Sequence, residues 1–172
     1  MKKRLSPSRT ARYYYLRFLR LKGDPRAIAR GVALGTFIGI TPTLPLHTVL
    51  ILISAPLLRA NLVAALLAAT VVSNPLTFGP QYYASWLIGG WLAPCHVSWD
   101  AIHTTLGQIT SGSLSFQESL AAVWRLGSAT LLTLVTGGIV LAAPIAAAAY
   151  FWAYRLVRRF QQRRAKRHLY SQ

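Results

Sequence analysis

The feature that most limits what this chain can fold into is a long middle part that is apolar and nearly free of charge. Residues Gly31–Leu58 contain no Lys, Arg, Asp or Glu. Of the 19 Lys and Arg residues, only Arg59 and Arg125 lie between Gly31 and Tyr154, and 53% of all residues are hydrophobic. A chain of 172 residues with this pattern is typical of a membrane protein with a single domain.

The basic residues flank the apolar part on both sides. Ten Lys or Arg residues lie between Lys2 and Arg30 and seven between Arg155 and Arg167, and the formal net charge is +16. The positive-inside rule therefore predicts a multi-pass protein with both termini in the cytoplasm and an even number of net crossings. A nucleic-acid binder would spread its basic residues over one folded face, so we expect no nucleic acid to bind.

Prolines interrupt the two hydrophobic units. The first unit, residues 31–58, contains Thr41-Pro42-Thr43-Leu44-Pro45, and the second, residues 60–93, contains Ser73-Asn74-Pro75 and Gly79-Pro80. Each half of the first unit is about half a membrane long. Within hydrocarbon, non-helical backbone is tolerated only where protein or a water-filled cavity satisfies it. The breaks therefore predict broken or re-entrant units that meet at a site or a shared core. The residues we expect to break helices are Pro42, Pro45, Pro75 and Pro80.

The predicted fold class is all-α, a polytopic helical membrane protein. Residues 10–22 have an arginine side and an aromatic side at helical spacing, which predicts an amphipathic helix in the membrane interface or, alternatively, one packed on its own protein. Either residues 31–58 re-enter the membrane and return to the cytoplasm, or they cross and residues 60–93 re-enter; the single Arg59 favours the first. The predicted parts are a basic cytoplasmic segment with the interfacial helix (1–30), a membrane domain (31–154) with the units 31–58 and 60–93, an external loop (94–127) and a final span (128–154), and a basic cytoplasmic tail (155–172).

Polar residues beside the prolines point to a binding site. Ser73 or Asn74 before Pro75 predicts a helix start, and Thr41 or Thr43 before a proline gives the same signal. Two half-helices starting inside the bilayer would place two positive dipole ends near its middle, where they favour an anion. We therefore expect the chain to bind or translocate an anionic lipid, such as a polyprenyl phosphate or a phospholipid, or a small anionic solute. The candidate binding residues are Thr41, Thr43, His47, Asn61, Ser73, Asn74, Thr77, Gln81 and Tyr82.

A structural explanation of the same residues stands beside this hypothesis. Prolines also kink ordinary transmembrane helices, and Asn can bond across a helix pair. Gly31, Gly35 and Gly39 recur every four residues, which predicts close helix packing and allows a homo-oligomer. His47 has no carboxylate among its apolar neighbours and is more simply a structural histidine than part of a proton relay. The alternative function is a scaffold or anchor for an envelope-biogenesis partner.

The basic flanks are expected to lie on anionic lipid. The residues expected at the membrane surface are Arg12, Arg17, Arg20, Arg26, Arg30, Arg155, Arg158 and Arg159. We expect no enzyme, cofactor or metal centre. The sequence has no carboxylate pair in its apolar part, no convincing Ser, His and Asp set, and a single cysteine, Cys95.

Three stretches resemble the bacterial family called domain of unknown function 2062: "GDPRAIARG", "GVALGTFIGITPTLPLHTVL" and "LLRANLVAALLAATVVSNPLTFGPQYYASWLIGG". The resemblance covers roughly residues 13–155 and is most specific in Asn74–Thr77 and in Gly35–Pro42. Pro45 and His47 stand where that family usually has glycine and glutamine. The resemblance implies an integral protein of the bacterial inner membrane, in a family sometimes joined to glycosyltransferase domains. It adds a glycosyltransferase to the partners we expect.

Overall fold

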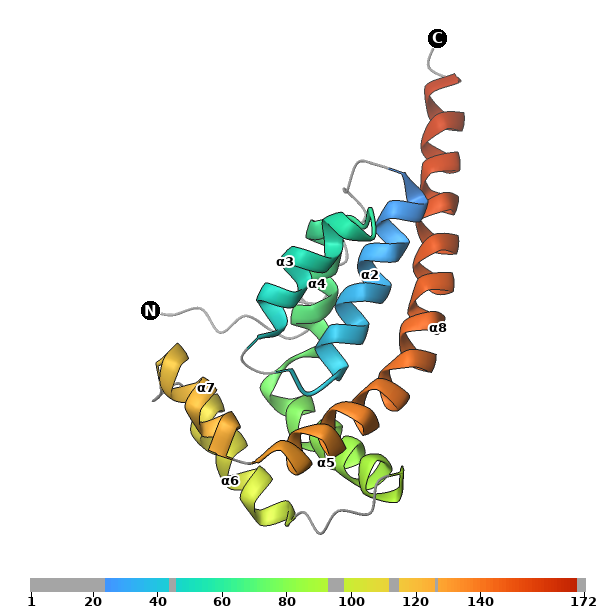
Figure 1. Ribbon diagram of the computed structural model, residues 1–172. Coiled ribbons are helices and arrows are strands. Elements are labelled where there is room, and N and C mark those ends of the chain that lie inside the picture. Colours follow the sequence, from blue (N-terminus) through green and yellow to red (C-terminus); the bar gives the residue numbers. More distant parts are fainter. Residues whose placement is uncertain (1–23, 44–45, 93–97, 112–114, 126, 170–172) are drawn as a thin grey trace, which may run out of the picture.

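The structure is a computed structural model that describes residues 24–43, 46–92, 98–111, 115–125 and 127–169. These residues form helices and no strand, so the all-α class is confirmed (Figure 1). The predicted N-terminal interfacial helix, with Arg12, Arg17 and Arg20, lies outside the described residues, as does Pro45. The helices are α2 (Pro25–Ile40), α3 (His47–Leu57), α4 (Leu62–Val72), α5 (Pro75–Leu92), α6 (Trp99–Thr110), α7 (Phe116–Arg125) and α8 (Ser128–Leu169).

Helix α2 lies between α4 and α8 and packs closely on both (Figure 1). Its glycine side faces α4: a Cβ added to Gly31 would overlap the carbonyl oxygen of Asn61, and one added to Gly35 would overlap that of Ala65. The order of these pairs makes α2 and α4 parallel. The regularly spaced glycines thus lie where two helices of the same chain approach closely.

A second close crossing joins α5 to α8. A Cβ on Gly89 would overlap the carbonyl oxygen of Thr133, and a Cβ on Gly137 would overlap that of Ser85. Ser85 and Thr133 are themselves fully or almost fully buried. Small residues on both helices thus bring the two backbones together, as glycines do between α2 and α4.

Three buried clusters fill the spaces between these helices. The first joins α2 and α8 through Ile28, Ala29, Ala153 and Val157. The second holds α3 and α4 against α2, with Ile51 at its centre. The third joins α5, α6 and α8 and contains three buried residues, Tyr82, Ile102 and Leu134. The clusters follow the chain of helix contacts from one end of the molecule to the other.

Two helix boundaries lie beside prolines. Helix α2 ends before Pro42, α5 begins at Pro75, and α4 and α5 are bent by 88° at the break between them. The prediction that Pro80 breaks a helix is wrong, because α5 continues through it. Pro80 removes only one backbone hydrogen bond near the start of the helix, and the following turns pack on α8.

Helix length separates α8 from the others. Within the described residues, only Ser128–Gln162 of α8 is long and apolar enough to cross a membrane alone. Leu62–Val72 and Thr77–Leu92 meet the same criterion only when the bent pair is taken together. Helices α2 and α3 have 16 and 11 residues, and about 20 are needed for a full crossing.

Candidate functional site

The first candidate site is the junction where α2 and α4 end. The Ser73 hydroxyl donates a hydrogen bond to the Gly39 carbonyl over 2.9 Å, which ties the two helix ends together. Thr41 Oγ1 donates to the Phe37 carbonyl over 2.8 Å, and Thr43 Oγ1 to the Ile38 carbonyl over 3.3 Å. The last carbonyls of a helix have no partner within it. These hydroxyls therefore satisfy the carbonyl end of α2.

This geometry corrects the expected role of Thr41 and Thr43. Neither begins the next helix, because α3 starts at His47 with Leu46 as its N-cap and has no side-chain capping bond. A hydroxyl at the end of a helix can donate to a helix carbonyl. Thr41 Oγ1 adds a second bond to the Phe37 carbonyl, which the Thr41 backbone amide already bonds, and Thr43 Oγ1 bonds the Ile38 carbonyl. His47 Nε2 lies 3.3 Å from Thr48 Oγ1, while its Nδ1 is buried without a hydrogen-bond partner.

Side chains at the start of α5 bond a carbonyl at the end of α4 in the same way. Thr77 Oγ1 lies within hydrogen-bond distance of the Val72 and Asn74 carbonyls and accepts from the Asn74 amide over 3.1 Å. Gln81 Nε2 donates to the Val72 carbonyl over 3.1 Å. Because a carbonyl can only accept, this bond fixes the orientation of the Gln81 amide. Its Oε1 is buried without a partner.

The predicted binding residues are only partly brought together. Thr41, Thr43, Ser73, Asn74, Thr77 and Gln81 gather at the junction. Asn61 does not: its Oδ1 caps the opposite end of α4, where it accepts from the Ala64 amide over 2.9 Å. Tyr82 packs in the apolar cluster with Ile102. The junction combines the carbonyl ends of two helices with the start of α5, and none of its residues is Lys or Arg.

The second candidate site lies at the other end of the bundle, where the arginines gather. Arg30 Nη1 donates to the Leu58 carbonyl over 3.0 Å, and the Asn61 amide donates to the Ala27 carbonyl over 2.8 Å. These bonds hold the start of α2 against the turn between α3 and α4. Arg59 lies in that turn and adopts a left-handed φ of 49°. Helix α8 runs antiparallel to α2 and brings its own arginines to this end (Figure 1).

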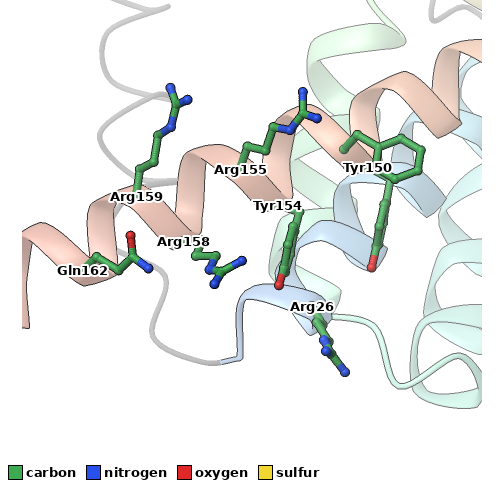
Figure 2. A pocket seen from close by; sticks show the side chains of 8 residues that line it. Arg26, Tyr150, Tyr154, Arg155, Arg158, Arg159 and Gln162 are labelled. Carbon is green, nitrogen blue, oxygen red and sulfur yellow. The ribbon is translucent and has the colours of Figure 1, made fainter.

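A pocket of about 850 Å³ opens between the start of α2 and the later turns of α8. We call it the arginine–tyrosine pocket. Figure 2 shows Tyr150, Tyr154 and Arg158 on the side of α8 that faces α2, near Arg26, while Arg155 and Arg159 point the other way. Among the described residues that line it, four are arginines and none is acidic. The pocket is lined by Arg26, Tyr150, Phe151, Tyr154, Arg155, Arg158, Arg159 and Gln162.

Packing holds the two tyrosines of this pocket in place. Both are partly buried against the cluster that contains Ile28 and Val157. Their rings are parallel, with an interplanar angle of 2° and centroids 6.3 Å apart. The rings therefore form a fixed wall, and the exposed guanidinium groups around them supply the charge. Guanidinium groups bind phosphate oxygens in a bidentate manner, and phenolic hydroxyls can donate further hydrogen bonds.

The dipole of α2 is not the source of this positive charge. Asp24 is the N-cap of α2, and its Oδ1 accepts from the Arg26 amide over 3.2 Å. The carboxylate thus occupies the position that an anion would take at the helix start. The positive charge of the pocket comes from the arginine side chains.

Sequence reasoning found the arginines of the pocket but missed Tyr150, Tyr154 and Gln162. The sequence did contain a signal for the two tyrosines. Residues 150, 154 and 158 are four apart, which places two tyrosines and one arginine on one face of a helix. The sequence contains no such signal for Arg26, because its place in the pocket depends on α2 lying beside the end of α8.

Over the residues that the structure describes, the fold and the two sites define a class: a helical protein with one helix long enough to cross a membrane alone and an arginine-rich pocket at one end. The comparison with protein families matches residues 8–166 to the family described as "Uncharacterized protein conserved in bacteria (DUF2062)". The chain belongs to this family, as the resemblance indicated. No curated protein and no solved structure matches the chain.

Proposed function

We propose that this protein is an inner-membrane protein that binds the phosphate-bearing headgroup of an anionic lipid in the arginine–tyrosine pocket. The observation that carries the proposal is the pocket itself: four arginines and two packed tyrosines from α2 and α8, with no acidic residue in the lining. Arginines near an anionic membrane surface each contribute about 1 kcal/mol of attraction. Tyrosines are enriched at the same depth of a membrane.

The placement in the membrane forms part of this proposal. Helix α8 crosses the bilayer, α4 and α5 form a second, broken crossing, and α2 and α3 form a re-entrant hairpin that returns to the cytoplasm. Both termini then lie on the cytoplasmic side. Support comes from the arginines, since Arg26, Arg30 and Arg59 lie at the same end of the bundle as Arg155. This is the distribution that the positive-inside rule favours.

The depth of the breaks supports the same placement. A Cβ on Gly138 would overlap the ring of Pro42, so the loop after α2 touches α8 at Gly138. At about 1.5 Å per residue, this contact is about 15 Å from the start of α8, or half the hydrocarbon thickness. At that depth every backbone carbonyl needs a protein partner. The hydroxyls of Thr41, Thr43 and Ser73 supply such partners.

This proposal keeps the anionic lipid that the sequence suggested and moves its site. At the junction, the hydroxyls of Thr41, Ser73 and Thr77 donate to the carbonyls of Phe37, Gly39 and Val72. The cationic groups lie at the opposite end of α2. We therefore propose binding at the arginine–tyrosine pocket, with the junction as the element that stabilises broken helices inside the membrane.

Calorimetric titration of the purified protein in a neutral detergent tests the proposal. The probes are dioctanoyl phosphatidylglycerol, dioctanoyl phosphatidylcholine and glycerol 3-phosphate. We expect phosphatidylglycerol to bind most tightly. Replacing Arg26 or Arg158 by Gln should weaken that binding about fivefold for each residue, which corresponds to about 1 kcal/mol per charge.

Arg59→Gln is the matched control, since Arg59 lies at the same end but outside the pocket lining. An equal loss of affinity in Arg59→Gln would mean that diffuse charge, not the pocket, attracts the lipid. Equal binding of phosphatidylcholine would contradict the proposal. Equal binding of glycerol 3-phosphate would make the ligand a soluble phosphate.

A further inference from the structure

The hairpin of α6 and α7 lies at the opposite end of the molecule from the arginine–tyrosine pocket (Figure 1). It is attached through α6: Ile102 is buried against Tyr82 of α5 and Leu134 of α8. Trp99 adds ring contacts with Tyr83 and Trp86, at centroid distances of 5.0 and 5.7 Å. These contacts fix the hairpin against the ends of α5 and α8.

Helix α7 carries an apolar stripe that stays largely exposed in the described structure. Phe116, Leu120 and Trp124 are four residues apart and therefore share one face of the helix. Their side chains are 55%, 39% and 79% exposed. At the start of the helix, the Ser115 amide donates to Glu118 Oε2 over 2.7 Å, and the Glu118 amide donates to Ser115 Oγ over 3.3 Å. This reciprocal cap stabilises a short helix whose apolar side is free.

The distance along α8 places the stripe one bilayer away from the pocket. Helix α7 ends beside the start of α8, with Gly127 at a left-handed φ of 84° in the turn between them. From Ser128 to Tyr154, α8 is about 40 Å long at 1.5 Å per residue. A bilayer with its headgroup regions is about 40–45 Å thick. If Tyr154 lies in one interface, α7 lies in the other.

The charge of this region differs from that of the pocket. Residues 94–127 contain Asp100, Glu118 and Arg125 and no other Lys, Arg, Asp or Glu. Their formal sum is −1, so an anionic surface would not attract them. Trp91 at the end of α5 is 88% exposed and provides another tryptophan at this end. Exposed tryptophans with little charge are typical of an anchor in the headgroup region.

We propose that α7 lies flat in the outer interface of the membrane, with Phe116, Leu120 and Trp124 inserted among the lipids. Its partner is a lipid surface, bound through apolar area and not through charge. The proposal rests on the membrane insertion of α8 but not on headgroup binding in the pocket. Insertion of an amphipathic helix of this kind buries its apolar side about 5–10 Å below the headgroup boundary.

Spin labels test this proposal on the full chain with Cys95→Ser, reconstituted in phosphatidylcholine vesicles. Labels are placed by Leu120→Cys and Phe116→Cys on the stripe, by Gln117→Cys on another exposed side of α7, and by Ile145→Cys on the exposed surface of α8. Collision with oxygen and with a water-soluble nickel complex gives the depth of each label. We expect the stripe labels to lie about 5–10 Å deeper than the Gln117 label.

Each outcome bears on a different claim. The stripe depth should stay the same when phosphatidylglycerol is added or salt is raised, because charge does not drive insertion. Equal collision of the nickel complex with labels at Leu120 and Gln117 would overturn the proposal. Shielding of the stripe labels from both oxygen and nickel would also overturn it, because it would indicate that a second copy of the chain covers the stripe. A label at Ile145 exposed to nickel would instead contradict the membrane insertion of α8.

Discussion

The two ends of the molecule both carry aromatic residues, yet they differ in how those residues are combined with charge. At one end, Tyr150 and Tyr154 line a pocket together with four arginines, of which Arg26 and Arg158 lie on the same side as the tyrosines. At the other end, Trp91 and Trp124 are exposed beside a hairpin with a formal charge of −1. If both ends contact lipid as we propose, the charged neighbours of the aromatic residues decide whether that contact depends on headgroup chemistry or on apolar area.

The largest expected effect is a loss of stability of the helix bundle that separates the two ends of the molecule. A Cβ at Gly35 would overlap the Ala65 backbone, whereas one at Gly90 would meet nothing within 4 Å. Gly35→Ala should therefore lower the free energy of unfolding by about 3 kcal/mol, because the helix backbones must separate. Gly90→Ala should leave it unchanged or raise it by up to about 1 kcal/mol. Thermal unfolding in detergent measures both, and equal midpoints would contradict the close packing.

The next effect is a salt dependence, which should differ between the two ends because only the pocket is expected to bind lipid through charge. Raising NaCl from about 0.01 to 0.15 M shortens the Debye length from about 30 to 8 Å. We expect weaker binding of phosphatidylglycerol to the arginine–tyrosine pocket and no change in the depth of α7. Titration and spin-label depth, measured on the same preparation, provide the test. A parallel change at both ends would remove the distinction between them.

A smaller effect concerns Trp124, whose side chain is 79% exposed. Trp124→Ala removes about 2 kcal/mol of apolar burial from the interface. The label at Leu120 should move toward water, while phosphatidylglycerol affinity at the pocket stays the same. Gln117→Ala, on another side of α7, is the control and should not move the label. An unchanged depth in Trp124→Ala would show that this tryptophan does not anchor the hairpin.

The smallest effect is a pH dependence at the start of α7. Hydrogen bonds from the Ser115 amide and then from its hydroxyl lower the pKa of Glu118. Because the folded pKa lies below the unfolded one, the stabilisation is present above the unfolded pKa and is lost as the pH falls through the folded pKa. Hydrogen exchange in α7 should accelerate there. Glu118→Gln should abolish that dependence, and a dependence that persists would point to another group.

Much of the local structure follows from the sequence. The breaks before Pro42 and at Pro75 follow from the chemistry of proline, and the final helix follows from its apolar length. Pro80 was misjudged because packing of α5 on α8 lies outside any local rule. The sequence predicts that Thr41 or Thr43 starts a helix, but both hydroxyls donate to carbonyls at the end of the preceding helix. A threonine beside a proline fits both roles, and only the neighbouring carbonyls distinguish them.

The sequence by itself determined the helical class, the apolar middle and the basic flanks, because hydropathy and charge are properties of the residues themselves. Only the tertiary structure decided which distant residues meet. Arg26 and Arg158 share a pocket because α2 and α8 are antiparallel and packed through Ala29 and Ala153. Ser73 reaches Gly39 because glycines let α4 approach α2. Such contacts depend on how closely two backbones can approach, which the residues of both helices decide together.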